Sequence, residues 1–232
     1  MSAATPAAPE PAEAVEAVIF DYGGVISARL LDNLERFETA MGYPTGSVHE
    51  LMFGPTRPAD GEVPDFHQLE TGELSLLEYL ERLERRAPEV LGRPLDLESY
   101  RAFTAASPLA VHWPVVHRVR ALRDDGVRLA LLTNNVREFG DAWRSSFPVD
   151  ELFAHIVDSS EVGLRKPDPR VYEHTCELLD VAPTATVFVD DNLENCVAAD
   201  AVGLEAVRFG VDPWASLAEL DVVLARRGVR TR

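Results

Sequence analysis

Carboxylates directly follow two short apolar runs of the chain, where a side chain can act on a bound ligand. Asp21 comes after the run 18–20 and is followed by an aromatic residue and two glycines, the first of which is Gly23. Asp190 and Asp191 come in the same way after the run 187–189. Glycines beside a carboxylate let the backbone approach a ligand closely. The pattern predicts a reactive site at strand ends, with Asp21 as an oxygen nucleophile.

Two further segments carry residues that suit the handling of a phosphoryl group. Thr133 and Asn134 follow the apolar run 129–132 and can donate hydrogen bonds to phosphoryl oxygens. Lys166 precedes a proline, where a helix start is disfavoured, and a lysine fixed there can neutralise both the phosphoryl group and the attacking carboxylate. We therefore predict that Thr133 and Lys166 are both catalytic and substrate-binding, and that Asn134 binds substrate.

The adjacent pair Asp190 and Asp191 predicts a metal site, because neighbouring carboxylates repel each other unless a cation holds them. Hard oxygen ligands suit Mg²⁺, which keeps several waters and substrate phosphate in its coordination shell. One of the two is expected to bind the metal directly and the other through water. We favour Asp191 for the direct contact.

Alternating strand and helix patterns place these residues at one edge of a sheet. Strands are predicted at 17–21, 128–133, 155–157, 186–190 and 205–208, and helices at 115–122, 170–179 and 195–202, with a further helix through Phe139 and Trp143. Strands that alternate with helices form a parallel sheet covered on both faces, and such sheets bind ligands beyond the carboxyl ends of the strands. The predicted fold class is α/β, with a Rossmann-like core of three layers.

The stretch 28–110 has no strong signal for a buried strand and is predicted to be an inserted helical domain. A capping-box pattern at Ser75 and a possible cap at Asp96 indicate the starts of separate helices. Residues 1–14 are mostly Ala, Pro and Glu and are predicted to form a disordered tail. The core domain is then assigned to 15–27 and 111–232, with the helical insert over the site.

Composition narrows the possible partners and compartment. The chain has 232 residues, 46% of them hydrophobic, which allows one substantial domain or a core with a smaller companion. Its formal net charge of -17 repels phosphate backbones and anionic lipids, so neither nucleic acid nor membrane is expected as a partner. Cys176 and Cys196 lack metal-ligand spacing and are expected to be buried free thiols. These features predict a cytoplasmic protein, monomeric or homodimeric, that acts on a small molecule.

Taken together, the motifs resemble the haloacid dehalogenase (HAD) superfamily of aspartate-nucleophile hydrolases, over nearly the whole chain after the tail. The resemblance implies a Mg²⁺-dependent phosphatase that hydrolyses a small phosphomonoester through an aspartyl-phosphate on Asp21. It implies that the metal ligands are Asp21, the carbonyl of Gly23, Asp190 and Asp191. It also implies that the helical insert is a small cap, which closes on substrate and excludes water.

Position 23 departs from the usual pattern of these phosphatases, most of which carry a second aspartate two residues after the nucleophile. That aspartate protonates the leaving group and then activates water, a contribution of about 10²–10⁴-fold. The chain resembles sugar-phosphate phosphatases that have a glycine at this point, so slow to moderate activity biased toward good leaving groups, such as anomeric sugar phosphates, is expected. His67, Glu70 or a bound water are alternative proton donors.

Two other functions remain open. A 2-haloacid dehalogenase on the same fold would use Asp21 as nucleophile, and its halide leaving group needs neither an acid nor magnesium; Arg29 is a candidate for its halide cradle. A catalytically weak binding protein would keep the pocket without turnover. Metal dependence separates the first alternative from the phosphatase, and Asp21→Asn separates the second, because a binder keeps its ligand.

Overall fold

A parallel sheet of five strands forms the centre of the protein in a computed structural model that describes residues 13–54, 62–106 and 110–229. The strands are β1 (Ala17–Phe20), β2 (Arg128–Thr133), β3 (His155–Asp158), β4 (Thr186–Asp190) and β5 (Glu205–Arg208). Their order is β3-β2-β1-β4-β5, so each predicted strand is present. From β1 the sheet extends through β2 and β3 on one side and through β4 and β5 on the other. In sheets of this kind, ligands bind at the carboxyl ends of the strands where the strand order changes direction.

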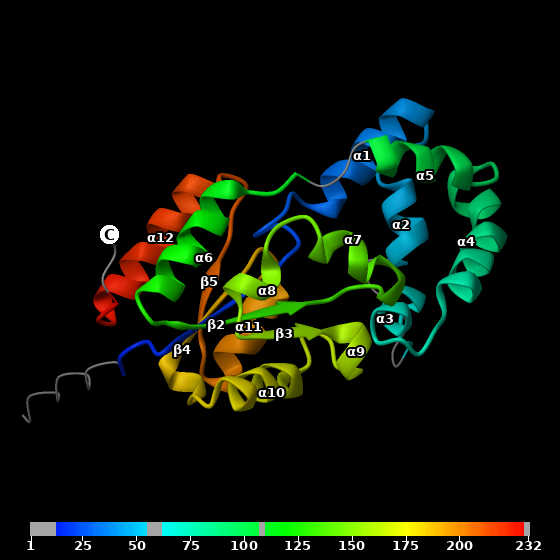
Figure 1. Cartoon of the computed structure of the whole chain (residues 1–232). Helices are drawn as coiled ribbons and strands as arrows, with labels where there is room; N and C mark the ends of the chain where they lie inside the picture. Colours follow the sequence, from blue (N-terminus) through cyan, green and yellow to red (C-terminus); the bar gives the residue numbers. More distant parts are fainter. Residues whose placement is uncertain (1–12, 55–61, 107–109, 230–232) are drawn as a thin grey trace, which may run out of the picture.

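Helices cover both faces of the sheet (Figure 1). Alternate side chains of β1 enter one of two separate hydrophobic clusters, because successive residues of a strand point to opposite faces. One cluster is completed by α6 (Trp113–Asp124) and α12 (Pro213–Arg226), the other by α10 (Pro169–Leu179) and α11 (Leu193–Val202). The predicted α/β fold with three layers is confirmed.

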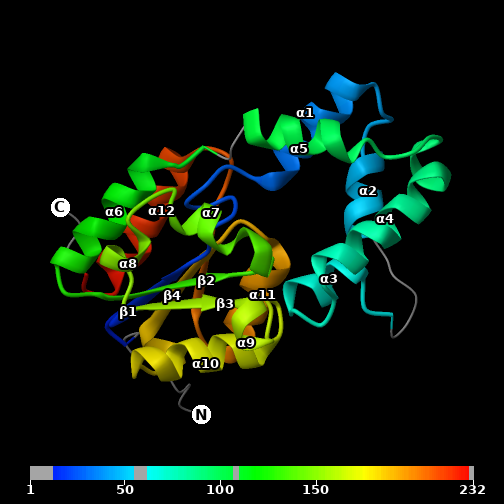
Figure 2. The same ribbon diagram turned by 45° about the vertical axis from the view of Figure 1, so that its right-hand side comes forward.

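In the described part of the chain between β1 and α6, five helices pack around a third hydrophobic cluster, to which Val136 of the core also contributes. We call these five helices the helical unit. They are α1 (Leu30–Met41), α2 (Ser47–Phe53), α3 (Asp65–Glu70), α4 (Leu76–Leu91) and α5 (Leu97–Ala106). The predicted capping box is present at the start of α4, and the side chain of Asp96 accepts from the amide of Ser99 at the start of α5. Figure 2 shows the helical unit beyond the edge of the sheet to which the strand arrows point.

The chain leaves and re-enters the core through two linkers that lie side by side. Ser27 and Val111 form an antiparallel bridge. The amide of Ala28 donates to the carbonyl of Ala110 at 2.8 Å, and the amide of His112 donates to the carbonyl of Ile26 at 2.7 Å. The two chain crossings between the helical unit and the core therefore lie at one place in the fold.

The remaining helices are short: η1 (Arg137–Phe139), α7 (Gly140–Arg144), α8 (Val149–Leu152), α9 (Ser159–Val162) and η2 (Pro183–Ala185). The single helix expected through Phe139 and Trp143 is instead a 3-10 turn followed by a short α-helix. The change falls at Gly140, a residue that is unfavourable inside a helix. The helix expected at 195–202 begins earlier, because the Asn192 side chain caps it through the amide of Glu194.

The N-terminal tail, the lengths of the helices and the two cysteines can be compared with the sequence-based predictions. Residues 1–12 of the tail predicted at 1–14 lie outside the described residues. Within the described parts of the chain, no helix combines the length and apolar character needed to cross a membrane. Cys176 and Cys196 are both buried and free, as expected.

Candidate active site

The carboxyl ends of three neighbouring strands bring the predicted reactive groups together. Asp21 directly follows β1, Thr133 is the last residue of β2, and Asp190 is the last residue of β4. Because β2 and β4 both pair with β1, these three ends are adjacent. Lys166 reaches the same place from the segment between α9 and α10 and is 1% exposed.

Lys166 is the cation that joins the two carboxylates of this edge. Its Nζ lies 2.7 Å from Asp21 Oδ1 and 2.7 Å from Asp190 Oδ2. Burial lowers the pKa of the Lys166 ammonium, but the charges of Asp190 and Asp21 outweigh burial, so that the net shift of the pKa is upward. Lys166 therefore stays protonated, as a residue that neutralises an anion beside Asp21 must be.

Asp21 is buried in a way that makes its charge costly. Burial raises the pKa of Asp21 to about 8, with Lys166 opposing the shift and Asp190 adding to it. The amide of Tyr22 donates to Asp21 Oδ1 at 2.7 Å, which orients the carboxyl group. A further positive charge next to Asp21 would favour its ionised form, the form that can attack an electrophile.

The two adjacent aspartates have different surroundings. Asp190 is fully buried and accepts from Lys166, from the amide of Asn192 at 2.8 Å and from Asn195 Nδ2 at 3.1 Å. Asp191 is half-buried, and its Oδ2 lies 2.9 Å from Arg29 Nε. Asp190 is thus held by the protein, whereas Asp191 has one oxygen paired with a residue at the start of the helical unit. This difference favours Asp191 as the direct ligand of a cation.

The carboxylates of Asp21, Asp190 and Asp191 form a group that fits a divalent cation. They each offer an oxygen within 4.8 Å of the others. Among the described residues, the cations paired with these three carboxylates are Lys166 and Arg29, so the cluster carries one uncompensated negative charge when all three are ionised. Burial, followed by the charge of Asp190, raises the pKa of Asp191 as well. Oxygen ligands and surplus negative charge are the conditions in which Mg²⁺ binds.

The two glycines after Tyr22 have unequal roles. Gly24 has a φ of +77°, and a Cβ there would lie 2.4 Å from Asp191 Oδ2, so only glycine allows Asp191 to lie against the backbone. A Cβ at Gly23 would meet no heavy atom within 4 Å. Both glycines are expected to let the backbone approach a ligand, and at Gly24 the structure shows a close approach of a side chain to the backbone. For Gly23, the carbonyl remains the predicted ligand atom.

Asn134 acts on Lys166 with both ends of its side-chain amide. Its Nδ2 donates to the carbonyl of Lys166 at 2.9 Å, and its Oδ1 accepts from the amide of Lys166 at 2.9 Å. The side chain predicted to bind substrate therefore holds the main chain of Lys166. Thr133 is buried next to it, and its hydroxyl makes only a long contact of 3.5 Å with the carbonyl of Asn134. The Thr133 hydroxyl is the better placed of the two side chains for a ligand.

His67 and Glu70, the two side chains considered as proton donors in place of a second aspartate, both lie on α3, next to Arg165. Burial, aided by the charge of Arg165, lowers the pKa of His67 to about 4, so this imidazole carries no extra proton at neutral pH. Burial raises the pKa of Glu70, with Arg165 opposing the shift, and Glu70 Oε2 accepts from Arg165 Nε at 2.8 Å. The contact between Glu70 and Arg165 was not foreseen from the sequence.

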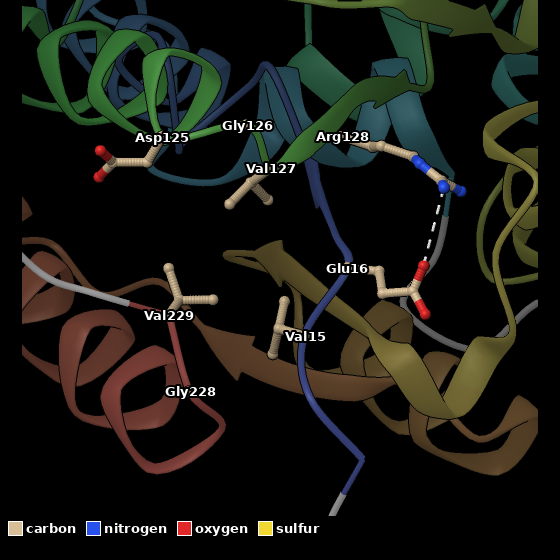
Figure 3. Close-up of a pocket in the computed structure, with 8 residues that line it drawn as sticks. All are labelled: Val15, Glu16, Asp125, Gly126, Val127, Arg128, Gly228 and Val229. Atoms are coloured by element: carbon tan, nitrogen blue, oxygen red, sulfur yellow. Dashed lines mark ion pairs between the residues drawn. The ribbon is translucent and has the colours of Figure 1, made fainter.

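A separate cavity of about 530 Å³ lies at the opposite edge of the sheet, where the strands begin (Figure 3). It is lined by Val15, Glu16, Arg128 and Val229, among others, and on one side of it Glu16 Oε2 lies 3.8 Å from Arg128 Nη2. Because it adjoins the amino ends of β1 and β2, it takes no part in the arrangement around Asp21.

Residues 15–203 match the family model of the haloacid dehalogenase-like hydrolases. Among curated relatives, a sesquiterpene phosphatase of Aspergillus oryzae is 36% identical over 44% of this chain and 52% of its own length. An (S)-2-haloacid dehalogenase of a Pseudomonas strain is 31% identical over 69% of this chain and 66% of its own length. The chain thus spans about half to two thirds of the length of these relatives.

The fold is shared with solved structures. A HAD family enzyme of Bacteroides thetaiotaomicron, crystallised with magnesium and inorganic phosphate, superposes with a TM-score of 0.64 at 21% identity. The match covers 88% of this chain and 98% of that one. At this level of identity the likeness concerns the fold, in agreement with the sheet order described above.

Proposed function

The chain belongs to the haloacid dehalogenase-like hydrolases, and from that premise we propose that it is a Mg²⁺-dependent phosphatase that hydrolyses a small phosphomonoester through an aspartyl-phosphate on Asp21. The observation that carries this proposal is the cluster of Asp21, Asp190 and Asp191, whose surplus negative charge is explained by a divalent cation. Phosphatases are among its relatives, and one structural neighbour is crystallised with magnesium and phosphate.

The proposed reaction has two displacements at phosphorus. An Asp21 carboxylate oxygen forms a bond to phosphorus while the bond to the ester oxygen breaks, and the leaving oxygen takes the electron pair and then a proton from water. Water then attacks the aspartyl-phosphate, which releases inorganic phosphate and a proton and restores Asp21. A bound Mg²⁺ would neutralise the phosphoryl charge and lower the pKa of Asp21.

The chain's own residues prepare these steps. Lys166, 2.7 Å from Asp21 Oδ1, neutralises the carboxylate and the incoming phosphoryl group together. Thr133 would donate its hydroxyl to a phosphoryl oxygen, and Asn134 keeps Lys166 in place through its main chain. We assign residues 28–110 as the cap that closes over a substrate, with 15–27 and 111–232 as the core. The buried free cysteines support a cytoplasmic location.

Phosphate esters with good leaving groups are the expected substrates, because Gly23 has no acidic side chain and His67 is not an imidazolium at neutral pH. A small phosphate ester such as an anomeric sugar phosphate meets this condition. A 2-haloacid dehalogenase is the second candidate, favoured by the same lack of an acid and by a relative of that activity. It is weakened by the position of Arg29, which is paired with Asp191 at 2.9 Å and so is not free to hold a halide.

The test is an assay of phosphomonoesters, including para-nitrophenyl phosphate and glucose-1-phosphate, with Mg²⁺ and with EDTA. Turnover is expected to require Mg²⁺ and to fall by at least about 10³-fold in Asp21→Asn, because the nucleophile is lost. Turnover of 2-chloropropionate in EDTA, without hydrolysis of any ester, would instead establish the dehalogenase. Ligand binding that persists in Asp21→Asn, without turnover by the wild type, would indicate a binding protein.

A further inference from the structure

The end of α3 is docked on both loops that carry the catalytic groups. Glu70 is 6% exposed, and its Oε2 accepts from Arg165 Nε at 2.8 Å, one residue before Lys166. The carbonyl of Glu70 accepts from Ser159 Oγ at 2.7 Å, and the same hydroxyl accepts from the amide of Asn135 at 3.0 Å. Through its side chain and main chain, Glu70 therefore contacts the loop of Lys166 and the loop that follows β2.

The turn after α3 approaches the core closely enough to restrict its position. A Cβ at Gly72, which has a φ of +74°, would lie 3.3 Å from the carbonyl oxygen of Ser160 and 3.1 Å from Arg137 Nη2. Arg137 Nη2 in turn donates to the same carbonyl oxygen of Ser160 at 2.8 Å. These contacts, together with those of Glu70, define one docked position of the helical unit on the core.

Lys166 is held in place by residues that are distant from it in the sequence. Asn134 holds its main chain, and Asp21 and Asp190 hold its ammonium group. The preceding residue, Arg165, carries a second, partly exposed cation, and its ion-pair partner is Glu70. An Arg165 released from Glu70 would leave the loop of Lys166 without its side-chain contact to the helical unit.

We propose that Glu70 is a positioning residue of the catalytic site, which makes the docked position of the helical unit a condition for the correct placement of Lys166. Glu70 acts through Arg165 and gives no proton to the leaving group. The kinetic consequence rests on the proposed phosphatase function, whereas the contact itself is tested without turnover.

The kinetic experiment compares Glu70→Gln with Glu73→Gln, an exposed glutamate shortly after α3, and with Arg82→Gln, which breaks an ion pair inside the helical unit. In the presence of Mg²⁺, Glu70→Gln is expected to lower kcat/KM by about 10- to 100-fold, and by the same factor for aryl and alkyl phosphates, because misplacement of a catalytic group affects both alike. The control variants are expected to stay within about threefold of the wild type.

A double-variant cycle with Arg165→Gln adds a second criterion. If the two residues act as a unit, the double variant is expected to lose little more than either single variant. A loss in Glu70→Gln that grows as the leaving group becomes poorer would overturn the proposal, because it would identify Glu70 as the proton donor. Full additivity of the two losses would overturn it as well.

Amide hydrogen exchange tests the contact independently of activity. In Glu70→Gln the segment 163–168 is expected to exchange at least about tenfold faster than in Glu73→Gln, because the loop of Lys166 loses the ion pair of Arg165 with the helical unit. Equal exchange would refute the inference whatever the activity. Wild-type protein that hydrolyses no ester would refute the proposed function alone. Should Glu70→Gln fail to fold, Arg165→Lys keeps the charge without the Nε donor and is subject to the same criteria.

Discussion

Gly23→Asp is expected to make the protein a faster phosphatase on esters with poor leaving groups. A Cβ at position 23 would meet no heavy atom within 4 Å, and Gly23 is not among the glycines with positive φ. An aspartate therefore fits without backbone strain. The position lies two residues after Asp21, at the carboxyl edge of the sheet where a leaving group must depart.

The size of the gain follows from the role that the new carboxyl group takes. A positioned general acid contributes about 10²–10⁴-fold, or about 2.7–5.4 kcal/mol of activation free energy at about 1.36 kcal/mol per tenfold.

The free energy of unfolding is expected to change by less than about 1 kcal/mol. Replacement of a glycine at a position with compatible dihedral angles stabilises by about 0.4–1 kcal/mol through the unfolded chain. This gain offsets the repulsion between like charges, which is about 1 kcal/mol for a pair at about 4 Å in water. A thermal melt checks that any change in rate comes from the site rather than from the fold.

The assay measures kcat/KM with Mg²⁺ for para-nitrophenyl phosphate and for a simple alkyl phosphate. Gly23→Asp is expected to gain at least about 100-fold on the alkyl ester and less than about tenfold on the aryl ester, which leaves without a proton. Gly23→Asn, which has the same size and no acidic proton, is the matched control and is expected to gain nothing. Equal gains on both esters, or a gain in Gly23→Asn, would refute the reasoning.

Two other predictions follow from the carboxylate cluster. Gly24→Ala places a Cβ 2.4 Å from Asp191 Oδ2 at a φ of +77°, which displaces the Asp191 carboxylate. The affinity for Mg²⁺, measured by calorimetry, is therefore expected to fall at least about tenfold. An unchanged affinity would mean that Asp191 is not a ligand. Without metal, the pKa of Asp21 is raised from 3.8 to about 8, so its contribution to stability is present in acid and lost as pH rises through this range. Thermal melts in EDTA on either side of this range check the sign, and a loss of this contribution on acidification would contradict it.

The strands and the ends that carry the chemistry could be predicted because each signal is local. A short apolar run that ends in a carboxylate or threonine predicts a buried strand with a polar residue at its end, whatever the rest of the chain contains. The strands β2, β4 and β5 have the predicted bounds. The helix α12 was not among the predictions, although Asp212 caps it and Leu217, Leu220 and Leu224 are buried at helical spacing.

The contacts within the site could not be predicted because they join distant parts of the chain. Asn134 and Lys166 are 32 positions apart, and Glu70 and Arg165 are 95 apart. Each residue type has a plausible ligand-binding role by itself, and only the fold assigns it to a neighbour. The unequal roles of Gly23 and Gly24 likewise depend on where Asp191 lies, which the spacing of the motifs does not specify.

The bridge between Ser27 and Val111 and the hydrogen bond from Ala28 to Ala110 have an evolutionary consequence. Because both ends of the helical unit meet there, an unrelated insert with the same end-to-end spacing could replace it by recombination without altering the sheet register. Substrate choice could then change with the exchanged insert as a whole, while β1, β2 and β4 are inherited unchanged. A chimaera joined at these two points would need to bring one carboxylate of its own, to meet Arg165.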